Sequence, residues 1–284
     1  MIRLSAFADE ASTGFAGQLA ALKRNGISLI ELRGLDGKNI AEIDEQQAES
    51  YAAALREAQI SVWSIGSPIG KISIEGDLSV HFEKLRHLCR LAKIFGTDKM
   101  RVFSFFDAYE KRDAVIAALQ RMVAIAAEYG VGLYHENEKK IYGDTLARVE
   151  EIADAVPGLY LVYDPANFIE VGEPSTKTLP ALHGRSAYFH IKDVIMETGE
   201  LVPAGYGDGA IAELVARIGE GDKVLTLEPH LAVFDGYAEI DGTEMKNKFS
   251  YTTNDEAFDA AVSALKGVLA AQGFVETKGG FSKQ

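Results

Sequence analysis

The alternation of short apolar segments with amphipathic segments is the feature that most constrains the fold of this chain. About eight strand-helix cycles follow one another, with no break in composition between the two halves. Parallel strands joined by helices form either a closed barrel or an open, doubly wound sheet. An open sheet normally uses fewer cycles and begins with a glycine-rich turn, which the segment Phe7–Glu10 lacks. The pattern therefore predicts an α/β fold, a (β/α)₈ TIM barrel, in a single domain.

The expected elements follow from the period of the apolar residues and from the residues that end each segment. Asp44 is expected to cap one helix, and Gly96 to end another. We assign residues 1–276 to the barrel and 277–284 to a flexible C-terminal tail. Strands are expected at residues 2–7, 28–32, 60–64, 99–103, 131–136, 159–164, 186–190 and 224–228, and helices at about 14–25, 43–58, 78–95, 112–129, 145–155, 178–183, 211–218 and 254–271.

The composition is that of a globular protein whose charge excludes several kinds of partner. Of the 284 residues, 47% are hydrophobic, and the net charge of −13 repels nucleic-acid phosphates. No segment reaches the ~20 apolar residues of a membrane span, and the N-terminus lacks the apolar core of a signal peptide. We therefore expect a cytoplasmic protein without nucleic-acid or membrane partners. The single cysteine, Cys89, lies in a helical apolar pattern and is expected in the core.

Four of the later strands end on side chains that can bind a metal ion. Glu136, Asp164, His190 and Glu228 each follow an apolar run. The carboxyl ends of barrel strands meet at one rim, so these side chains are expected to converge. Three carboxylates crowded together repel one another unless a cation balances them. The sequence thus predicts one divalent metal site. Its oxygen-rich donors favour Mn²⁺ or Mg²⁺, and Zn²⁺ or Co²⁺ also fit.

The residues around these strand ends resemble those of a known family, the xylose-isomerase-like TIM barrels, which include sugar-phosphate isomerases and epimerases. The similar motifs are Glu136-Asn137, Tyr163-Asp164, Phe189-His190-Ile191-Lys192-Asp193 and Leu227-Glu228-Pro229. The similarity runs roughly from Ile2 to Ala271. It implies that Glu136, Asp164, His190 and Glu228 bind one divalent metal. As in the family's ketose epimerases, it also implies that the two glutamates exchange a proton with the substrate.

The physical chemistry of such a site fits the same activity. A metal that chelates a carbonyl and the neighbouring hydroxyl acidifies the C–H between them and stabilises the resulting enediolate. Two carboxylates can then remove and return a proton. We expect Glu136 and Glu228 to be the catalytic pair of an isomerase or epimerase in carbohydrate metabolism. Its substrate would be a small sugar, keto-polyol or related hydroxy-carbonyl compound. A dehydratase of the inosose type and a non-catalytic sugar-binding barrel stay open as alternatives.

Several residues at or just after strand ends are expected to contact the substrate. Arg33 and Lys71 would hold an acidic group, and Lys192 shares the face of His190. A structural ion pair of Lys192 with Asp193 or Glu228 is the alternative. Asn167 stands where many epimerases of the family have a histidine, and Met196 where ketose 3-epimerases have an arginine, which argues against ketose 3-epimerisation. The expected substrate contacts are Glu10, Arg33, Lys71, Asn167, Lys192 and His230, with Glu31 also lining the mouth.

The remaining motifs have both a structural and a functional interpretation. The glycine-rich segment Gly205–Gly209 is more typical of a turn than of a phosphate-binding loop. The segment Leu231–Tyr251 is long enough to form a lid or a subunit contact in a homo-oligomer. His135 alternates away from Glu136 and is expected behind the sheet. A trinuclear zinc site would need more ligands than the rim offers, because His81 and His87 fall on a helix expected away from the rim.

Overall fold

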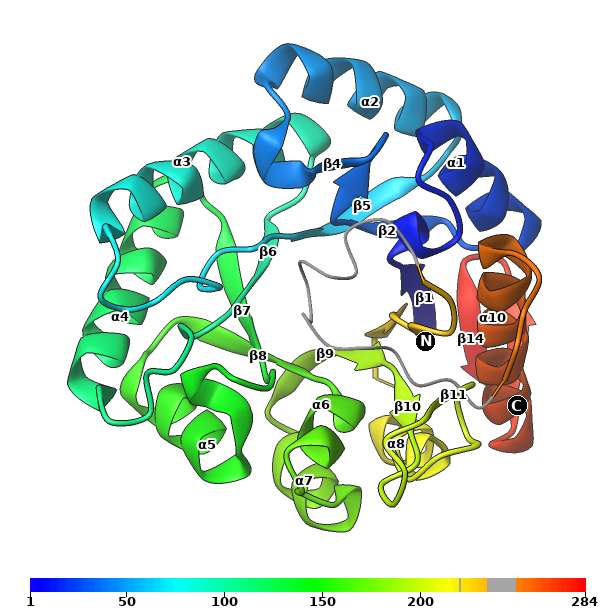
Figure 1. Cartoon of the computed structure of the whole chain (residues 1–284). Helices are drawn as coiled ribbons and strands as arrows, with labels where there is room; N and C mark the ends of the chain where they lie inside the picture. Colours follow the sequence, from blue (N-terminus) through cyan, green and yellow to red (C-terminus); the bar gives the residue numbers. More distant parts are fainter. Residues whose placement is uncertain (220, 234–248) are drawn as a thin grey trace.

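The chain forms a barrel of parallel strands surrounded by helices (Figure 1). The computed structural model describes residues 1–219, 221–233 and 249–284. Its largest sheet has the strand order β13-β14-β1-β12-β9-β8-β7-β6-β5-β2, and its ladders from β1 through to β2 are all parallel. The predicted TIM barrel is confirmed. Its strands are β1 (Ile2–Ala6), β2 (Leu29–Leu32), β5 (Ser61–Gly66), β6 (Lys99–Val102), β7 (Gly132–Glu136), β8 (Leu159–Tyr163), β9 (Ser186–Ile191) and β12 (Lys223–Leu227).

The helices cover the outside of the barrel, and short elements shape its loops (Figure 1). The helices are α1 (Phe15–Arg24), α2 (Glu45–Glu57), α3 (Leu78–Phe95), α4 (Arg112–Glu128), α5 (Leu146–Ala155), α6 (Pro165–Glu170), α7 (Ser175–Leu182), α8 (Ile211–Ile218) and α10 (Asn254–Ala271). The short elements are the 3₁₀ turns η1 (Ala8–Glu10), η2 (Ile40–Glu42) and η3 (Tyr142–Asp144), and the strand pairs β3 (Gly34–Leu35) with β4 (Lys38–Asn39) and β10 (Asp193–Val194) with β11 (Leu201–Val202).

The helix ends follow the capping residues that the sequence provides. Asp44 accepts a hydrogen bond from the backbone N–H of Gln47, whose side chain accepts one from the N–H of Asp44, so α2 begins with a capping box. Gly96 ends α3 in the left-handed conformation, with φ of 74°, which glycine adopts without strain. Because both signals are local, the expected caps are confirmed.

The C-terminal residues form a hairpin, which corrects the prediction of a flexible tail over 277–284. Strand β13 (Phe274–Thr277) pairs with β14 (Gly280–Lys283), and β14 joins the sheet where Phe281 pairs with Ile2 of β1. The Phe281 side chain is buried in the core. A Cβ atom at Gly280 would lie 2.4 Å from the carbonyl oxygen of Ile2, so only glycine allows this approach. The segment is mostly polar, so its sequence did not indicate that Phe281 would be buried.

The glycine-rich segment after β11 wraps a carboxylate rather than a phosphate. The backbone N–H groups of Gly205, Gly207 and Gly209 donate to the carboxylate of Asp193, with N···O distances of 2.8, 3.1 and 2.8 Å. A Cβ atom at Gly207 would lie 2.4 Å from Oδ1 of Asp193. Since a carboxylate of the chain already takes these donors, the segment is a structural turn, as the sequence favours.

The remaining predictions about the fold concern membranes, the cysteine and the long loop. Among the helices of the described residues, none is long and apolar enough to cross a membrane. Cys89 is buried in α3, as expected, and burial raises the pKa of its thiol to about 12. Most of the segment Leu231–Tyr251, for which a lid or subunit contact is expected, lies outside the described residues.

Candidate metal centre and barrel mouth

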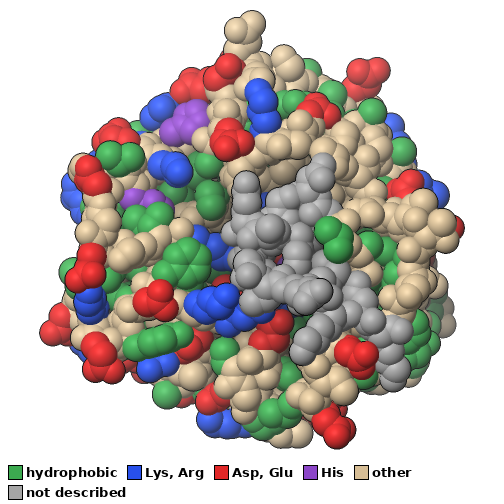
Figure 2. Space-filling model, viewed as in Figure 1, with side chains coloured by type: hydrophobic (Ala, Val, Ile, Leu, Met, Phe, Trp, Pro, Cys, Tyr) green, Lys and Arg blue, Asp and Glu red, His purple; other side chains and the backbone are tan. Residues whose placement is uncertain are grey.

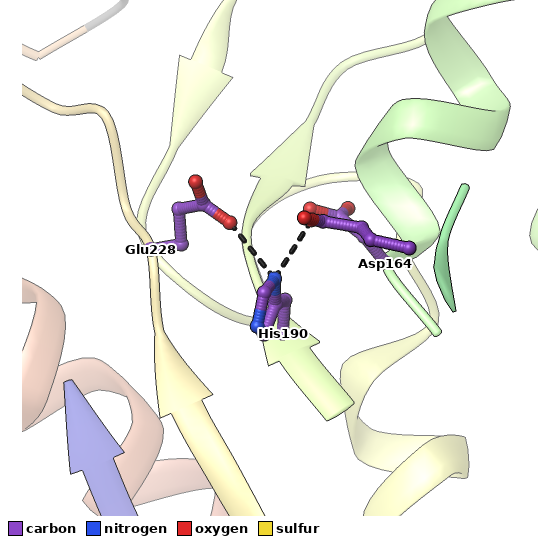
Figure 3. Close-up of side chains that lie close together, drawn as sticks. Asp164, His190 and Glu228 are labelled. Carbon is purple, nitrogen blue, oxygen red and sulfur yellow. Dashed lines mark hydrogen bonds and ion pairs between the residues drawn. The ribbon is translucent and has the colours of Figure 1, made fainter. Parts of the chain in front are cut away.

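Four side chains converge at the carboxyl ends of neighbouring strands. Glu136 ends β7, Asp164 follows β8, His190 lies in β9 and Glu228 follows β12. They are almost fully buried, and each offers a ligand atom within 4.8 Å of the others. Figure 3 shows Asp164, His190 and Glu228 pointing toward one another from three elements. The convergence expected from the strand ends is therefore present.

The two glutamates are held in the same way on either side of the histidine. Nδ1 of His190 lies 2.7 Å from Oε1 of Glu136 and 3.0 Å from Oε2 of Glu228. The second oxygen of each glutamate accepts a hydrogen bond from an arginine. Arg101 binds Oε2 of Glu136 at 2.7 Å, and Arg33 binds Oε1 of Glu228 at 3.0 Å. Each carboxylate thus has one oxygen fixed by a guanidinium and the other turned toward the centre.

The protonation of the cluster follows from burial and mutual charge. Burial by itself would raise the pKa of Glu136, but the charges of His190 and Arg101 outweigh it and hold that pKa at about 2. The pKa of Glu228 is likewise well below its ordinary value, because hydrogen bonds from His190 and His230 outweigh the effect of burial. Burial raises the pKa of Asp164 to about 8, although Lys192 opposes the shift. Both glutamates are therefore carboxylates at neutral pH.

Asp164 offers an oxygen that is suited to a metal ion. Its Oδ2 atom is buried and accepts no hydrogen bond from the described residues. Its Oδ1 atom caps α6 by accepting a hydrogen bond from the N–H of Asn167, and its own backbone is held by both polar groups of Asn137. The ammonium of Lys192 lies 3.4 Å from Oδ2 and balances part of its charge, and the oxygen keeps room for a further cation because it accepts no hydrogen bond there. Together with the carboxylate and imidazole donors, this oxygen fits a divalent ion.

Glu31 has a role at the centre that the sequence did not reveal. This carboxylate in β2 lies 3.2 Å from Nε2 of His190 and accepts a hydrogen bond from the hydroxyl of Tyr188 at 2.9 Å. A carboxylate on the far nitrogen of a metal-binding histidine fixes the ring and keeps its near nitrogen directed at the metal. Since Nε2 faces Glu31, Nδ1 of His190 is the nitrogen available to an ion.

Arg33 joins a second group of acids beside the centre. Its guanidinium donates to Asp9, Glu10 and Glu228, at N···O distances between 2.9 and 3.2 Å. Glu10, Glu228 and His230 also offer ligand atoms within 4.8 Å of one another. Because Arg33 already brings positive charge between Glu10 and Glu228, a second metal ion is not needed to balance them. His230 has φ of 47°, which non-glycine residues rarely adopt, and its N–H donates to Glu10 at 2.8 Å.

Lys192 and Asn167 belong to one buried network. The ammonium of Lys192 donates to Oδ1 of Asn167 at 2.6 Å and lies 3.4 Å from Oδ2 of Asp164. The amide nitrogen of Asn167 donates to the carbonyl of Asn137 at 2.9 Å. The structural ion pair suggested for Lys192 is therefore made with Asp164, and the partners Asp193 and Glu228 proposed from the sequence are wrong. Contact of Lys192 and Asn167 with a substrate stays a prediction.

A pocket opens beside the metal-binding cluster, on the side of β2, β5 and β6. It has a volume of about 270 Å³, and Lys71, Arg33 and Arg101 contribute to its lining. In the view of Figure 2, Lys and Arg side chains reach the centre of this face. Lys71 also lies 3.2 Å from a carboxylate oxygen of Glu138. Arg101 was not among the residues expected at the site, although an arginine between Met100 and Val102 in an apolar strand is a signal for one.

His81 supports the loop that carries Lys71, so it lies nearer to the mouth than expected. Its Nε2 accepts a hydrogen bond from the N–H of Gly70 at 2.9 Å, which requires a neutral ring. Burial, with a smaller effect of Lys84, lowers the pKa of His81 from 6.5 to about 4. As the pH falls through 6.5, the unfolded chain takes up a proton that the folded chain does not, so His81 makes the protein less stable at acidic pH.

We therefore expect the difference in the free energy of unfolding between the wild type and His81→Gln to change with pH. At pH 7 the variant should be less stable, because the buried ring and its contact with Phe105 are lost, even if the amide oxygen of glutamine accepts the N–H of Gly70. The difference should shrink by about 2 kcal/mol at pH 5, since only the wild type bears the cost of keeping this ring neutral. Urea unfolding at the two pH values measures it, with His87→Gln as the control. A difference that stays constant with pH would contradict the role assigned to His81.

Comparison with known proteins decides the family. The sequence matches the xylose isomerase-like TIM barrel family over residues 19–246. The chain belongs to this family. The resemblance inferred from the strand-end motifs is thereby confirmed. No curated protein matches the sequence itself.

Solved structures of the family have the same fold. A probable 3-DHS dehydratase, AsbF, from Bacillus anthracis is 18% identical, with a TM-score of 0.72 over 94% of this chain and 99% of that one. The IOLI protein, solved with a zinc atom, is 17% identical, with a TM-score of 0.73 over 95% and 99%. D-allulose 3-epimerase from a Methylomonas species is 19% identical, with a TM-score of 0.72 over 94% and 98%. At these identities the likeness concerns the fold, and family members include isomerases and epimerases of sugars.

Proposed function

We propose that this protein is a divalent-metal-dependent isomerase or epimerase of a small hydroxy-carbonyl compound of the carbohydrate type. One observation supports this most. Four consecutive parallel strands bring Glu136, Asp164, His190 and Glu228 within a single ligand sphere. The similar structures, which include an epimerase and a barrel solved with zinc, agree with such a site. Mn²⁺ and Mg²⁺ are the ions that its oxygen-rich donors favour.

The two glutamates are suited to carry a proton between substrate positions. An ion bound by the four side chains would polarise a substrate carbonyl and its neighbouring hydroxyl. Glu136 or Glu228 would then take the proton from the carbon between them, and the other would return one. Each glutamate is deprotonated because cations surround it, and each keeps one oxygen fixed by an arginine. This arrangement holds the reacting oxygen of each base in place before the substrate arrives.

A test of the function begins with the metal content of the purified protein, followed by incubation with ketoses and inositol ketones in D₂O. We expect one divalent ion per chain and deuterium at the carbon beside the carbonyl, observed by proton NMR. New sugar isomers would accompany this exchange. Ligand binding without any exchange would instead indicate a non-catalytic sugar-binding barrel.

A dehydratase is the second candidate, and one comparison favours it. The AsbF structure, described as a probable dehydratase, covers 94% of this chain. The same base could remove a proton beside the carbonyl, after which a β-hydroxyl would leave as water. The incubation in D₂O separates the two activities, because dehydration gives an unsaturated product with new ultraviolet absorbance. Isomerisation loses no water and changes the mass only by the deuterium that is exchanged in.

A further inference from the structure

We propose that the pocket beside the metal-binding cluster binds an oxyanion of the substrate, a carboxylate or a phosphate, through Arg101 and Lys71. The inference rests on the proposed function in one respect, because it assumes that the substrate extends from the cluster into this pocket. It narrows the substrate class to acidic hydroxy-carbonyl compounds.

Arg101 carries the argument furthest. It is 5% exposed and donates a hydrogen bond to Glu136, while its buried Nε atom has no hydrogen-bond partner among the described residues. Its guanidinium lies 4.5 Å from the ring centroid of Phe103 and 5.3 Å from that of Phe7, so aromatic rings hold it in place. An arginine presents five N–H donors, and burying some of them unused is costly. The part of the guanidinium that lines the pocket would donate to an oxyanion there.

Lys71 brings a second positive charge to the same ring. Its ammonium lies 4.3 Å from the ring centroid of Phe103, and the side chain lines the pocket with Arg101. The backbone that holds it is tightly fitted, because a Cβ atom at Gly70 would lie 2.1 Å from the carbonyl oxygen of Phe103. Lys71 is therefore presented by a fixed loop. Its ion pair with Glu138 at 3.2 Å leaves the ammonium at the pocket wall rather than in bulk solvent.

The charge of the lining favours an anion, although the protein as a whole is acidic. Of the described residues, the cations Arg33, Lys38, Lys71 and Arg101 and the acids Asp9 and Glu42 line the pocket. Asp9 is paired with Arg33 through both of its oxygens. The carboxylates that pair with Lys71 and Arg101 are Glu138 and Glu136, and neither is among the described residues that line the pocket, so the wall that faces a ligand carries mainly cations in a chain of net charge −13. Its place next to the cluster suits a substrate whose acidic end lies away from its carbonyl.

Anion binding can be measured without turnover, by calorimetry with malonate and with inorganic phosphate at constant ionic strength. We expect the wild type to bind at least one probe and Lys71→Met to bind it at least tenfold more weakly. Arg101→Lys, which keeps the charge but loses the planar fork, should weaken binding less. The control is Lys177→Met, which removes an exposed lysine of α7 that pairs with Glu173. The two probes distinguish a carboxylate site from a phosphate site.

Three outcomes would overturn the inference. In the first, the wild type binds neither probe. In the second, Lys71→Met binds a probe as tightly as the wild type. In the third, the anion binds only when the metal ion is present, which would mean that the ion and not the pocket holds it. The third is detected by repeating the titration on protein stripped with a chelator, because an anion bound in the pocket should persist there. Anion binding without any proton exchange in D₂O would refute the proposed function and leave the pocket assignment standing. Exchange on neutral sugars with no anion binding would support the proposed function and refute the pocket assignment.

Discussion

Replacing Glu228 by glutamine is expected to lower turnover by about 10²–10⁴-fold, the usual contribution of a positioned acid or base. The amide has nearly the same shape as the carboxylate, so it can still fill the site between Arg33 and His190. The amide cannot accept a proton, however, and its NH₂ group would face the N–H donors of Arg33 or His190. The measurement is kcat on the substrate identified in D₂O, together with the rate of deuterium incorporation.

The matched control is Glu213→Gln, an identical chemical change on the surface of α8. Glu213 forms an exposed ion pair with Arg217, and its loss should leave turnover unchanged. Thermal unfolding and metal analysis of both variants show whether the fold and the ion survive. If Glu228→Gln retained near-normal turnover, Glu228 would not be a catalytic base. Retention of the metal with loss of proton exchange is the result that supports the assignment.

The sequence was sufficient for elements whose signals are local. The expected helices over 78–95, 211–218 and 254–271 agree with α3, α8 and α10 to the residue, because each has an apolar stripe, and α3 and α10 also have a capping residue at their start. The short helix α6 was missed. It has only six residues and depends on Asp164, which caps it, and on Pro165 at its first position. Asp164 was expected as a metal ligand, and this expectation did not include its second role as the cap of α6.

The candidate site was predictable where topology alone decides the outcome. In a barrel, every residue that ends a strand faces the same rim, so Glu136, Asp164, His190 and Glu228 could be placed together without coordinates. Arg101 was not expected at the site, and Glu31 was expected at the mouth but without its partners. Their contacts depend on side-chain direction and on distances across the barrel, such as the 2.7 Å between Arg101 and Glu136. Strand period indicates a face, but it does not identify the partner on the opposite strand.

The last expected result concerns the metal itself, and it separates ligands from the residues that support them. A chelator should remove both the ion and the activity, and one equivalent of Mn²⁺ should restore them. At an ion concentration of 100 times Kd, the wild type should gain about 2.7 kcal/mol of stability. His190→Ala should lose the ion altogether, since Nδ1 is the central donor of the cluster. Thermal unfolding with and without the ion, and calorimetric titration, give the measurements.

Glu31→Gln is the informative companion variant, because Glu31 contacts the imidazole of His190 and is not one of the four converging side chains. Weakening of metal binding by about 10–100-fold is expected, which is the usual effect of losing an outer partner of a ligand. If His190→Ala bound Mn²⁺ as tightly as the wild type, His190 would not be a ligand. If the wild type bound no ion, the cluster would be a network of buried ion pairs and the proposed function would fail. A graded series, with the wild type tightest, Glu31→Gln weaker and His190→Ala without the ion, follows only if Nδ1 binds the metal and Glu31 aligns the ring.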